Sequence, residues 1–263
     1  MDSILHTIAS RLHPALTEEK RRIPAGVLEA LCGELPPSGR DFTAALRRSD
    51  GRIRAIAELK KASPSKGMIR PGLNAAILAA DLAGAGAAAL SVLTEPNYFL
   101  GSRENLLAAR AASPDTPILR KDFIFDEYQL LQAKLWGADA VLLIVSLLSA
   151  TELKRLFDFA TSLDLAVLVE THDRAEIETA LSVGAGIIGV NARNLADFST
   201  DATRASELIS ILPAGVVKVA ESAIDTPARL AAAEAVGADA CLIGEALMRA
   251  SDPAEALRRL YGR

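Results

Sequence analysis

One pattern, in which Gly-Ala closes a helical segment and an apolar run follows, occurs four times: GAGAAALSVL (84–93), GADAVLLIV (137–145), GAGIIGVN (184–191) and GADACLIG (237–244). The glycines that align are Gly86, Gly137, Gly184 and Gly237, which lie 51, 47 and 53 residues apart. A spacing of about two strand–helix units predicts another strand midway in each interval. Apolar runs occur there, at residues 117–123, 166–170 and 216–221, and one precedes the first repeat at 54–60. The sequence therefore predicts eight strands.

Segments of helical length lie between these strands. They are residues 74–83, 127–136, 150–162, 174–183 and 226–236. Capping signals begin several of them, with Thr151 and Asp173 as candidate caps and Pro227 in a first turn. Because each strand returns through a helix, the strands are expected to pair in parallel. An α/β fold of the (β/α)8 TIM barrel type fits the regular spacing best. A doubly wound sheet is the alternative, but no GxGxxG motif follows the first strand.

The first part of the chain does not fit the repeat. Ile4, Leu5, Ile8 and Leu12 have helical spacing, and a Pro-Pro-Ser-Gly break follows at 36–39. We expect an N-terminal helical extension over residues 1–50 and the barrel over 51–263, together forming a single structural domain.

Composition excludes several classes of protein. The chain has 263 residues, of which 50% are hydrophobic and 24% charged, so neither disorder nor a disulfide scaffold is expected. A net charge of -4 gives no general footprint for nucleic acid or an anionic membrane. Cys32 and Cys241 lack metal-binding spacing and fit a reducing compartment, so we expect a cytoplasmic protein. No secretory signal is visible, and the best candidate membrane span, 74–93, is mostly Ala and Gly and contains Asp81.

Charged residues occupy predicted strands where a barrel has its active site, at the carboxyl ends. Strand side chains alternate, so Ile56, Glu58 and Lys60 share one face of the first strand. Burying the two charges is costly unless they pair with each other or meet a charged ligand. This pair therefore indicates a functional site.

The other strands add polar groups to the same rim. The third carries Lys121 on one face and Arg120 and Asp122 on the other; periodicity leaves both registers open, and we favour Lys121 inward. Glu170 and Glu221 end the fifth and seventh strands, and the sixth ends in a run that contains Asn191 and Arg193. For each residue alone a rim salt bridge is an equally good interpretation. Together they predict a cluster suited to acid–base chemistry.

Two regions are candidates for anion binding. Ser63-Pro64-Ser65-Lys66-Gly67 follows the first strand, although these are also ordinary turn residues. Barrel phosphate sites commonly follow the seventh and eighth strands, where Ser222, Ala223, Gly244 and Glu245 lie.

His172 follows Glu170 closely and has two interpretations. It could act as a base, but His172-Asp173 also suits a helix-capping loop, which we favour. Trp136 and the tyrosines form no stacking array for nucleic acid.

Seven motifs lie along the chain: IAELKKASPSKGMIR (56–70), LSVLTEPNYFLGS (90–102), PILRKDFIFDEYQL (117–130), LVETHD (168–173), IGVNARNL (188–195), VAESAI (219–224) and LIGEALM (242–248). Together they resemble the indole-3-glycerol-phosphate synthase family of tryptophan biosynthesis. They span nearly the whole chain in the family's order and spacing.

The resemblance implies a carboxy-lyase that closes a ring and decarboxylates 1-(2-carboxyphenylamino)-1-deoxyribulose 5-phosphate. The products are indole-3-glycerol phosphate, carbon dioxide and water, and no metal or organic cofactor is expected. By motif, Lys121 resembles the general acid, Lys60 the lysine that binds the substrate carboxylate, and Glu170 the carboxylate that removes a proton or drives loss of the hydroxyl.

The remaining site residues also follow from the resemblance. Glu58, Asn191 and Glu221 match positions that orient these groups. The phosphate would rest on Ser63, Arg193, Ser222, Gly244 and Glu245, and Phe99 and Phe123 would line the aromatic pocket. The helical extension looks like the family's, which packs near the barrel mouth.

Two positions depart from the family's pattern. Ala223 stands where the family has glycine, and Ala192 where it tends to have a polar residue. We expect the loop at Ala223 to keep a negative φ and a phosphate to bind between Ser222 and Gly244.

Other functions remain as alternatives. One is a different sugar-phosphate barrel enzyme, such as phosphoribosylanthranilate isomerase or an aldolase that forms a lysine imine. The other is a non-catalytic barrel that binds a phosphorylated ligand. The expected partner is a small phosphorylated molecule; neither nucleic acid nor a membrane is expected, and the sequence leaves protein partners open.

Overall fold

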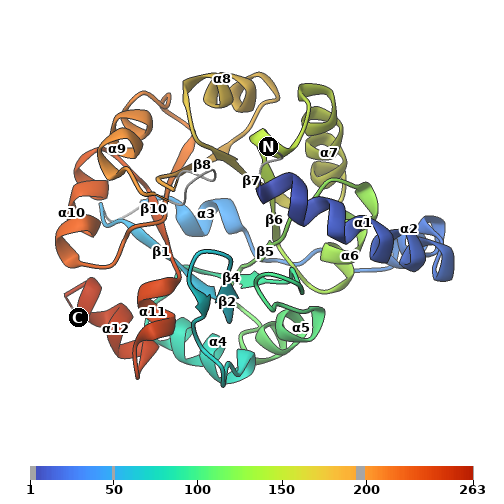
Figure 1. The fold of residues 1–263 in the computed structure, drawn as a ribbon, viewed down its shortest axis with the longest axis horizontal. Helices are drawn as coiled ribbons and strands as arrows, with labels where there is room; N and C mark the ends of the chain where they lie inside the picture. The colour runs from blue at the N-terminus through green and yellow to red at the C-terminus, as the bar shows by residue number, and fades with distance from the viewer. Residues whose placement is uncertain (1–3, 49–50, 194–198, 263) are drawn as a thin grey trace.

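The computed structural model describes residues 4–48, 51–193 and 199–262. Within these ranges, eight parallel strands close into a barrel, in the spatial order β1-β10-β9-β8-β7-β6-β5-β4 (Figure 1). The strands are β1 (Arg54–Leu59), β4 (Ala89–Leu93), β5 (Ile118–Lys121), β6 (Ala140–Ile144), β7 (Ala166–Thr171), β8 (Ile187–Asn191), β9 (Val217–Glu221) and β10 (Ala240–Ile243). A separate antiparallel pair, β2 (Ala62–Ser63) and β3 (Gly67–Met68), follows β1. The predicted (β/α)8 barrel is confirmed.

Helices surround the barrel. They are α4 (Ala75–Gly84), α5 (Arg103–Ala112), α6 (Glu127–Leu135), α7 (Ala150–Ser162), α8 (Arg174–Ser182), α9 (Ala202–Ser210), α10 (Pro227–Ala235), α11 (Glu245–Arg249) and α12 (Pro253–Leu260), with a 3-10 turn η1 (Val145–Leu147). All of these except α11 and the 3-10 turn begin at a side-chain cap. Asp173 caps α8 as predicted. The prediction of Thr151 as a cap is wrong, because Ser149 caps α7 and forms a capping box with Glu152. Among the described helices, none has both the length and the apolar character of a membrane span.

Alternation along the strands separates two apolar layers. Ile56 of β1 packs inside the barrel with Leu119, Leu142 and Leu168, whereas Leu59 packs outward against the helices. Charged residues that share the inward face therefore project into the barrel near its carboxyl end.

The outward charges of β5 are buried rather than exposed. Arg120 is 3% exposed, and its guanidinium lies 2.8 Å from the carboxylate of Asp122 and 4.2 Å from the ring centroid of Trp136. It also donates to the Thr94 hydroxyl at 3.0 Å. This pairing removes the conflict between the two registers, because Lys121 faces inward while its charged neighbours satisfy each other outside.

The repeated GADA segments fix two strands that carry site residues. The Asp139 carboxylate accepts the Ile118 N–H at 2.8 Å, while its own N–H donates to the Ile118 carbonyl. Asp239 bonds to Lys218 in the same way, with the N–H to carboxylate distance at 2.9 Å. The two aspartates thus anchor the start of β5 and of β9, whose carboxyl ends reach the site.

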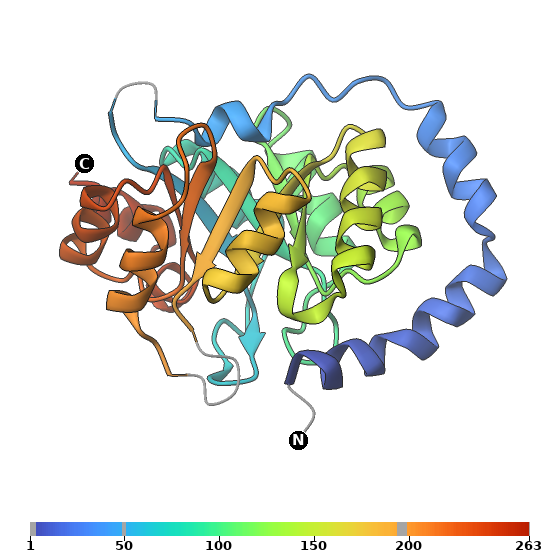
Figure 2. The same cartoon turned by 90° about the horizontal axis from the view of Figure 1, so that it is seen from above.

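The N-terminal segment runs along the barrel from one end to the other (Figure 2). It comprises α1 (Ile4–Arg22), α2 (Ala25–Gly33) and α3 (Phe42–Leu46). Leu5 and Ile8 of α1 line the cavity at the mouth, and Phe42 and Leu46 of α3 pack into the interior cluster at the opposite end. Lys20 ties α1 to the start of α6 through an ion pair of 2.5 Å. The predicted boundary at residue 50 lies outside the described residues.

Candidate active site

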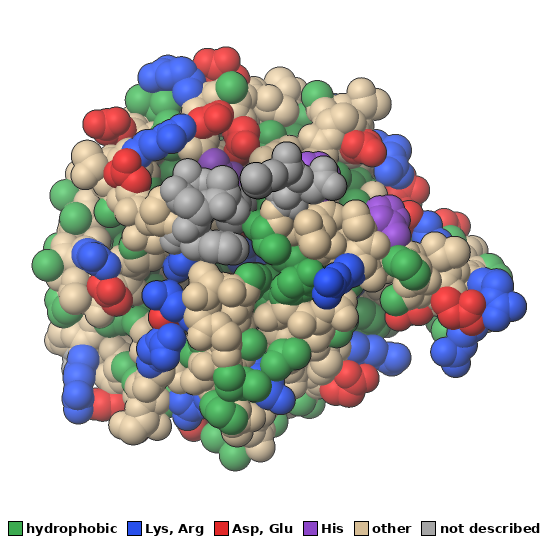
Figure 3. All heavy atoms as spheres, in the orientation of Figure 1, with side chains coloured by type: hydrophobic (Ala, Val, Ile, Leu, Met, Phe, Trp, Pro, Cys, Tyr) green, Lys and Arg blue, Asp and Glu red, His purple; other side chains and the backbone are tan. Residues whose placement is uncertain are grey.

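A cavity of about 450 Å³ opens at the carboxyl ends of the strands. The structure brings all of the predicted site residues to its wall: Glu58, Lys60, Ser63, Phe99, Lys121, Phe123, Glu170, Asn191, Arg193, Glu221, Ser222, Gly244 and Glu245. Around this mouth, Lys and Arg side chains lie beside hydrophobic ones on the face shown in Figure 3. The last two residues of the IGVNARNL motif, Asn194 and Leu195, lie outside the described residues.

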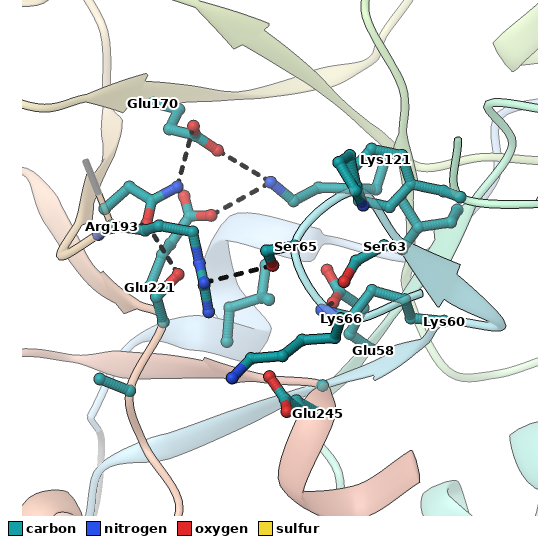
Figure 4. A pocket seen from close by; sticks show the side chains of 18 of the residues that line it. Glu58, Lys60, Ser63, Ser65, Lys66, Lys121, Glu170, Arg193, Glu221 and Glu245 are labelled. Carbon is teal, nitrogen blue, oxygen red and sulfur yellow. Dashed lines mark hydrogen bonds and ion pairs between the residues drawn. The ribbon is translucent and has the colours of Figure 1, made fainter. Parts of the chain in front are cut away.

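Lys121 forms the centre of a buried ion-pair network (Figure 4). Its Nζ lies 2.8 Å from Glu170 Oε2 and 3.2 Å from Glu221 Oε2. Burial opposes the charge on Lys121, but Glu170, Glu221 and Glu58 outweigh burial and raise the pKa of the lysine. Lys121 therefore holds its proton at rest, as a general acid must.

The two glutamates of this network differ in their protonation. Burial raises the pKa of both carboxyls, but for Glu170 the Lys121 charge and the neighbouring His172 ring reverse the effect, and its pKa falls well below the ordinary value. The pKa of Glu221 stays raised, through burial and the negative charge of Glu170. Like charges in one site push their pKa values apart, so Glu170 is the resident anion and Glu221 is the group that takes up a proton.

A second ion pair, between Lys60 and Glu58, lines the same cavity. Lys60 Nζ lies 2.6 Å from Glu58 Oε1, and the two side chains are 17% and 4% exposed. The alternation predicted for the first strand is thus confirmed. Because Glu58 holds the Lys60 ammonium group in place, that group is already oriented when an anion enters the cavity.

Two glycines leave space for the carboxylates of Glu221 and Glu58. A Cβ placed on Gly189 would lie 2.1 Å from Glu221 Oε1, and one on Gly244 would lie 2.3 Å from Glu58 Oε1. Sequence reasoning missed Gly189, although a glycine inside a strand signals the close approach of another group. Gly244 was predicted for its N–H, and the structure adds this second reason for the absence of a side chain.

Asn191 connects three parts of the site. Its Nδ2 donates to Glu170 Oε1 at 3.1 Å, and its Oδ1 accepts the Ser222 hydroxyl at 2.7 Å and the Arg193 N–H at 3.0 Å. One amide therefore fixes the acid–base group relative to the two loops that follow β8 and β9.

Cationic and hydroxyl groups gather on one side of the cavity. Arg193 Nη1 lies 3.4 Å from the Ser65 hydroxyl, and Lys66 extends toward Glu245 (Figure 4). The sequence indicated Lys66 only as part of a candidate anion-binding turn, and it gave no sign of Arg249, which pairs with Glu245 at 2.9 Å. These contacts give this wall the groups that an anion needs.

The loop after β9 contradicts the predicted backbone conformation. Ser222 has φ 69° and Ala223 has φ 58°, so the expectation of a negative φ at Ala223 is wrong. The chain turns from β9 into α10 within a short loop whose first residue is held by Asn191 and whose Ala223 carbonyl accepts from Arg229 at 3.2 Å. These anchors hold the turn in the left-handed region even without glycine.

An apolar wall faces the charged groups. Phe99 and Phe123 lie with ring centroids 5.9 Å apart, and Leu5 and Ile8 of α1 line the same cavity. Buried Glu95 positions the Phe99 loop by accepting its N–H at 2.9 Å. Periodicity alone predicted only a helix here, whereas the resemblance to the family indicated an extension near the barrel mouth, where Leu5 and Ile8 lie.

His172 lies between two carboxylates. Its Nε2 is 3.4 Å from Glu170 Oε1, and its Nδ1 is 3.0 Å from Glu176 Oε2. The loop does cap α8, because the Asp173 side chain accepts the Glu176 N–H. The imidazole, however, also lies between the helix and the site, because one ring nitrogen faces Glu176 in the first turn of α8 and the other faces Glu170.

Within residues 4–48, 51–193 and 199–262, no group of three or more His, Cys, Asp or Glu is arranged to hold a metal ion. The ionisable groups described above are instead paired with lysine, histidine or amide donors.

Residues 5–260 match the family model described as indole-3-glycerol phosphate synthase. Proteins of that name from Campylobacter curvus and Campylobacter jejuni subsp. doylei are 45% and 43% identical to the chain, and both alignments cover 98% of it and 98% and 99% of the relative. The one from Laribacter hongkongensis is 47% identical over 84% of the chain and 85% of the relative.

Solved structures show the same fold at low sequence identity. The 3-hexulose-6-phosphate synthase from Salmonella typhimurium superposes with a TM-score of 0.62 at 13% identity, covering 80% of this chain and 97% of that one. A mutant tryptophan synthase alpha-subunit from Pyrococcus furiosus gives 0.62 at 11% identity, covering 81% and 99%.

Proposed function

The chain belongs to the indole-3-glycerol phosphate synthase family, and from this premise we propose how its barrel mouth carries out the reaction. The enzyme converts 1-(2-carboxyphenylamino)-1-deoxyribulose 5-phosphate to indole-3-glycerol phosphate, carbon dioxide and water. The observation that carries the assignment of roles is the position of Lys121, held between Glu170 and Glu221 in a cavity that also contains the Glu58–Lys60 pair.

The substrate lies with its two anionic ends on different parts of the wall. The phosphate rests against Ser63, Arg193, Ser222, Gly244 and the Glu245 N–H, where hydroxyl, guanidinium and backbone donors gather. The aromatic ring packs against Phe99 and Phe123, and its carboxylate binds Lys60. This arrangement brings the ketone toward Lys121.

Lys121 acts as the general acid in ring closure. The arene carbon that bears the carboxylate attacks the ketone carbon, and the ketone oxygen takes the Lys121 proton. Carbon dioxide then leaves, and the electron pair of the broken bond restores the aromatic ring. The raised pKa of Lys121 keeps it protonated until the oxygen gains negative charge.

Glu170 acts in the dehydration that follows. The hydroxyl takes a proton from the Lys60 ammonium, which the departed carboxylate has freed, and leaves as water. The carbon next to nitrogen loses a proton to the Glu170 carboxylate, and solvent restores the protonation of the lysines and Glu170 after turnover. Its low pKa means that it is ionised when the substrate binds. Glu58, Asn191 and Glu221 orient the lysines, Glu170 and the substrate.

The cytoplasm is the compartment that suits the thiols. Cys32 and Cys241 are both free and buried, and thiols persist in reducing compartments.

Turnover of the carboxyphenylamino substrate tests the assignment. The purified protein should produce indole fluorescence, and Lys121→Ala should lower kcat by about 10²–10⁴-fold, the usual value of general acid catalysis. A folded, purified protein that forms no indole product would refute the function. A Lys121→Ala variant with parent kcat would refute only the role of Lys121.

A further inference from the structure

His172 occupies a position that the reaction as described above does not use. It lies in the turn between Glu170 of β7 and the start of α8, and its side chain is 17% exposed. One ring nitrogen faces Glu170 Oε1 at 3.4 Å, and the other faces Glu176 Oε2 at 3.0 Å. The backbone N–H of His172 also donates to Glu176 Oε2, at 2.7 Å.

The two carboxylates determine how many protons the ring carries. A neutral imidazole has one N–H and one lone pair, so one of its nitrogens would direct a lone pair at a carboxylate oxygen. An imidazolium has an N–H on both nitrogens: Nδ1 hydrogen-bonds the Glu176 carboxylate at 3.0 Å, and Nε2 forms an ion pair with Glu170 at 3.4 Å without the geometry of a hydrogen bond. Burial opposes this charge, but the carboxylates of Glu170 and Glu176 outweigh burial and raise the pKa of His172 to about 10.

We propose that His172 is a positioning residue for Glu170: as an imidazolium it ties the Glu170 carboxylate to Glu176 in the first turn of α8. The chain of contacts runs from the helix through the ring to the carboxylate that bonds Lys121. His172 itself touches no reacting atom in this arrangement.

The role follows from what happens to Glu170 during the reaction, and in this respect it rests on the proposed function. Glu170 Oε2 is held by Lys121, while Oε1 faces Asn191 Nδ2 and His172 Nε2. When Lys121 gives its proton to the substrate, the Lys121–Glu170 ion pair is lost. The contacts on Oε1 then keep the carboxylate in place, and the imidazolium charge keeps it ionised.

Other charged groups near the ring come from several elements. The hollow beside it is lined by His6 of α1, Asp173 and Glu176 at the start of α8, Arg193 after β8, and Asp201 and Arg204 at the start of α9. The two carboxylates at the ring nitrogens, Glu170 and Glu176, are the groups that raise its pKa.

Nuclear magnetic resonance of the imidazole nitrogens tests the charge directly. The chain has three histidines, so the signal missing from His172→Gln identifies His172. In the parent protein this ring should remain an imidazolium well above pH 6.5 and titrate near pH 10, and Glu176→Gln should move the titration to lower pH. A ring that titrates near 6.5 would overturn the proposal.

Kinetics test the positioning. In His172→Gln and Glu176→Gln, kcat should fall about tenfold, the lower range for a hydrogen bond to a charged group, while KM changes by less than about twofold. In His172→Gln the acid limb of the kcat–pH profile should also move to higher pH, because Glu170 loses the charge that lowers its pKa. In Glu176→Gln the ring is still charged at acid pH, so that limb should stay in place. Glu176→Gln keeps a side-chain oxygen that can accept the backbone N–H of His172. It therefore carries the test if His172→Gln does not fold.

Glu178→Gln is the matched control, because this glutamate is an exposed residue of the same helix. It should keep the parent kcat and pH profile. If both test variants melt at lower temperature but keep the parent kcat and pH profile, His172 has only a structural role and the proposal is wrong. A parent protein that makes no indole product would refute the proposed function, whereas the titration of His172 would still decide its charge.

Discussion

Ala223→Gly should stabilise the protein, although glycine usually weakens a fold. Ala223 has φ 58° and follows Ser222 at φ 69°. The left-handed region brings the Cβ close to the following carbonyl oxygen, so a residue with a side chain is strained there. Removing the methyl group relieves that strain without loss of a hydrogen bond, since the contact from Arg229 is to the backbone carbonyl.

The expected gain is a difference between two effects. The left-handed conformation costs alanine about 1–2 kcal/mol. Glycine gives the unfolded chain more freedom, which offsets about 0.4–1 kcal/mol of the relief. The free energy of unfolding should therefore rise by about 1 kcal/mol, which for a chain of this size raises Tm by about 2–4 °C.

Urea unfolding of the parent and the variant measures the change, with m expected to stay constant. Ala250→Gly is the control, because Ala250 is also a partly buried loop residue but has φ −68°. There the methyl group causes no strain, and glycine should cost about 0.4–1 kcal/mol. If Ala223→Gly is destabilised as much as Ala250→Gly, the turn is not strained and the reasoning fails.

Four other changes have defined outcomes. Lys121→Ala should lower kcat by about 10²–10⁴-fold, measured by indole fluorescence, and parent turnover would contradict its role as the acid. Lys60→Ala should raise KM at least about tenfold through loss of a charged hydrogen bond, and an unchanged affinity for a reduced substrate analogue would show that Lys60 points elsewhere. Gly189→Ala should impair turnover, because its Cβ would lie 2.1 Å from a carboxylate oxygen of Glu221. Gly186→Ala is the control, since a Cβ there meets nothing within 4 Å, and equal activity of the two variants would reject the clash. The stability that protonated His172 provides should be complete below pH 6.5 and should disappear as the pH rises to about 10. The parent protein should therefore lose more free energy of unfolding over this interval than His172→Gln, and an equal loss in both proteins would contradict the prediction.

Local periodicity was sufficient to predict the barrel and the inward face of its first strand. A strand places alternate side chains on opposite faces, so Glu58 and Lys60 could be assigned to one face from the sequence alone. Lys121 needed one more argument, since Arg120 and Asp122 on the other face are charged as well. The structure shows that those two residues pair outside the barrel, a contact that the strand pattern does not reveal.

The features that sequence reasoning missed depend on neighbours that are distant along the chain. Gly189 matters because Glu221 of the next strand occupies the space above it. The positive φ of Ala223 depends on anchors at Asn191 and Arg229, and residue type alone favoured the opposite sign. Helix starts depend on residues that are close along the chain and were predicted more accurately: the observed cap of α7, Ser149, lies only two residues from the expected cap at Thr151.

The balance of charge in the cavity explains why substrate binding and acid–base chemistry are linked. Three carboxylates, of Glu58, Glu170 and Glu221, face two lysines, Lys60 and Lys121, so one carboxylate lacks a full partner. Its burial raises the pKa of Glu221, which lets the site hold an additional proton at rest. In the proposed binding mode a substrate carboxylate on Lys60 competes with Glu58 for the same ammonium group. The arriving negative charge would also raise the pKa of neighbouring acids, so a bound substrate would favour protonated Glu221 and leave Lys121 paired chiefly with Glu170, the carboxylate that we propose accepts the later proton.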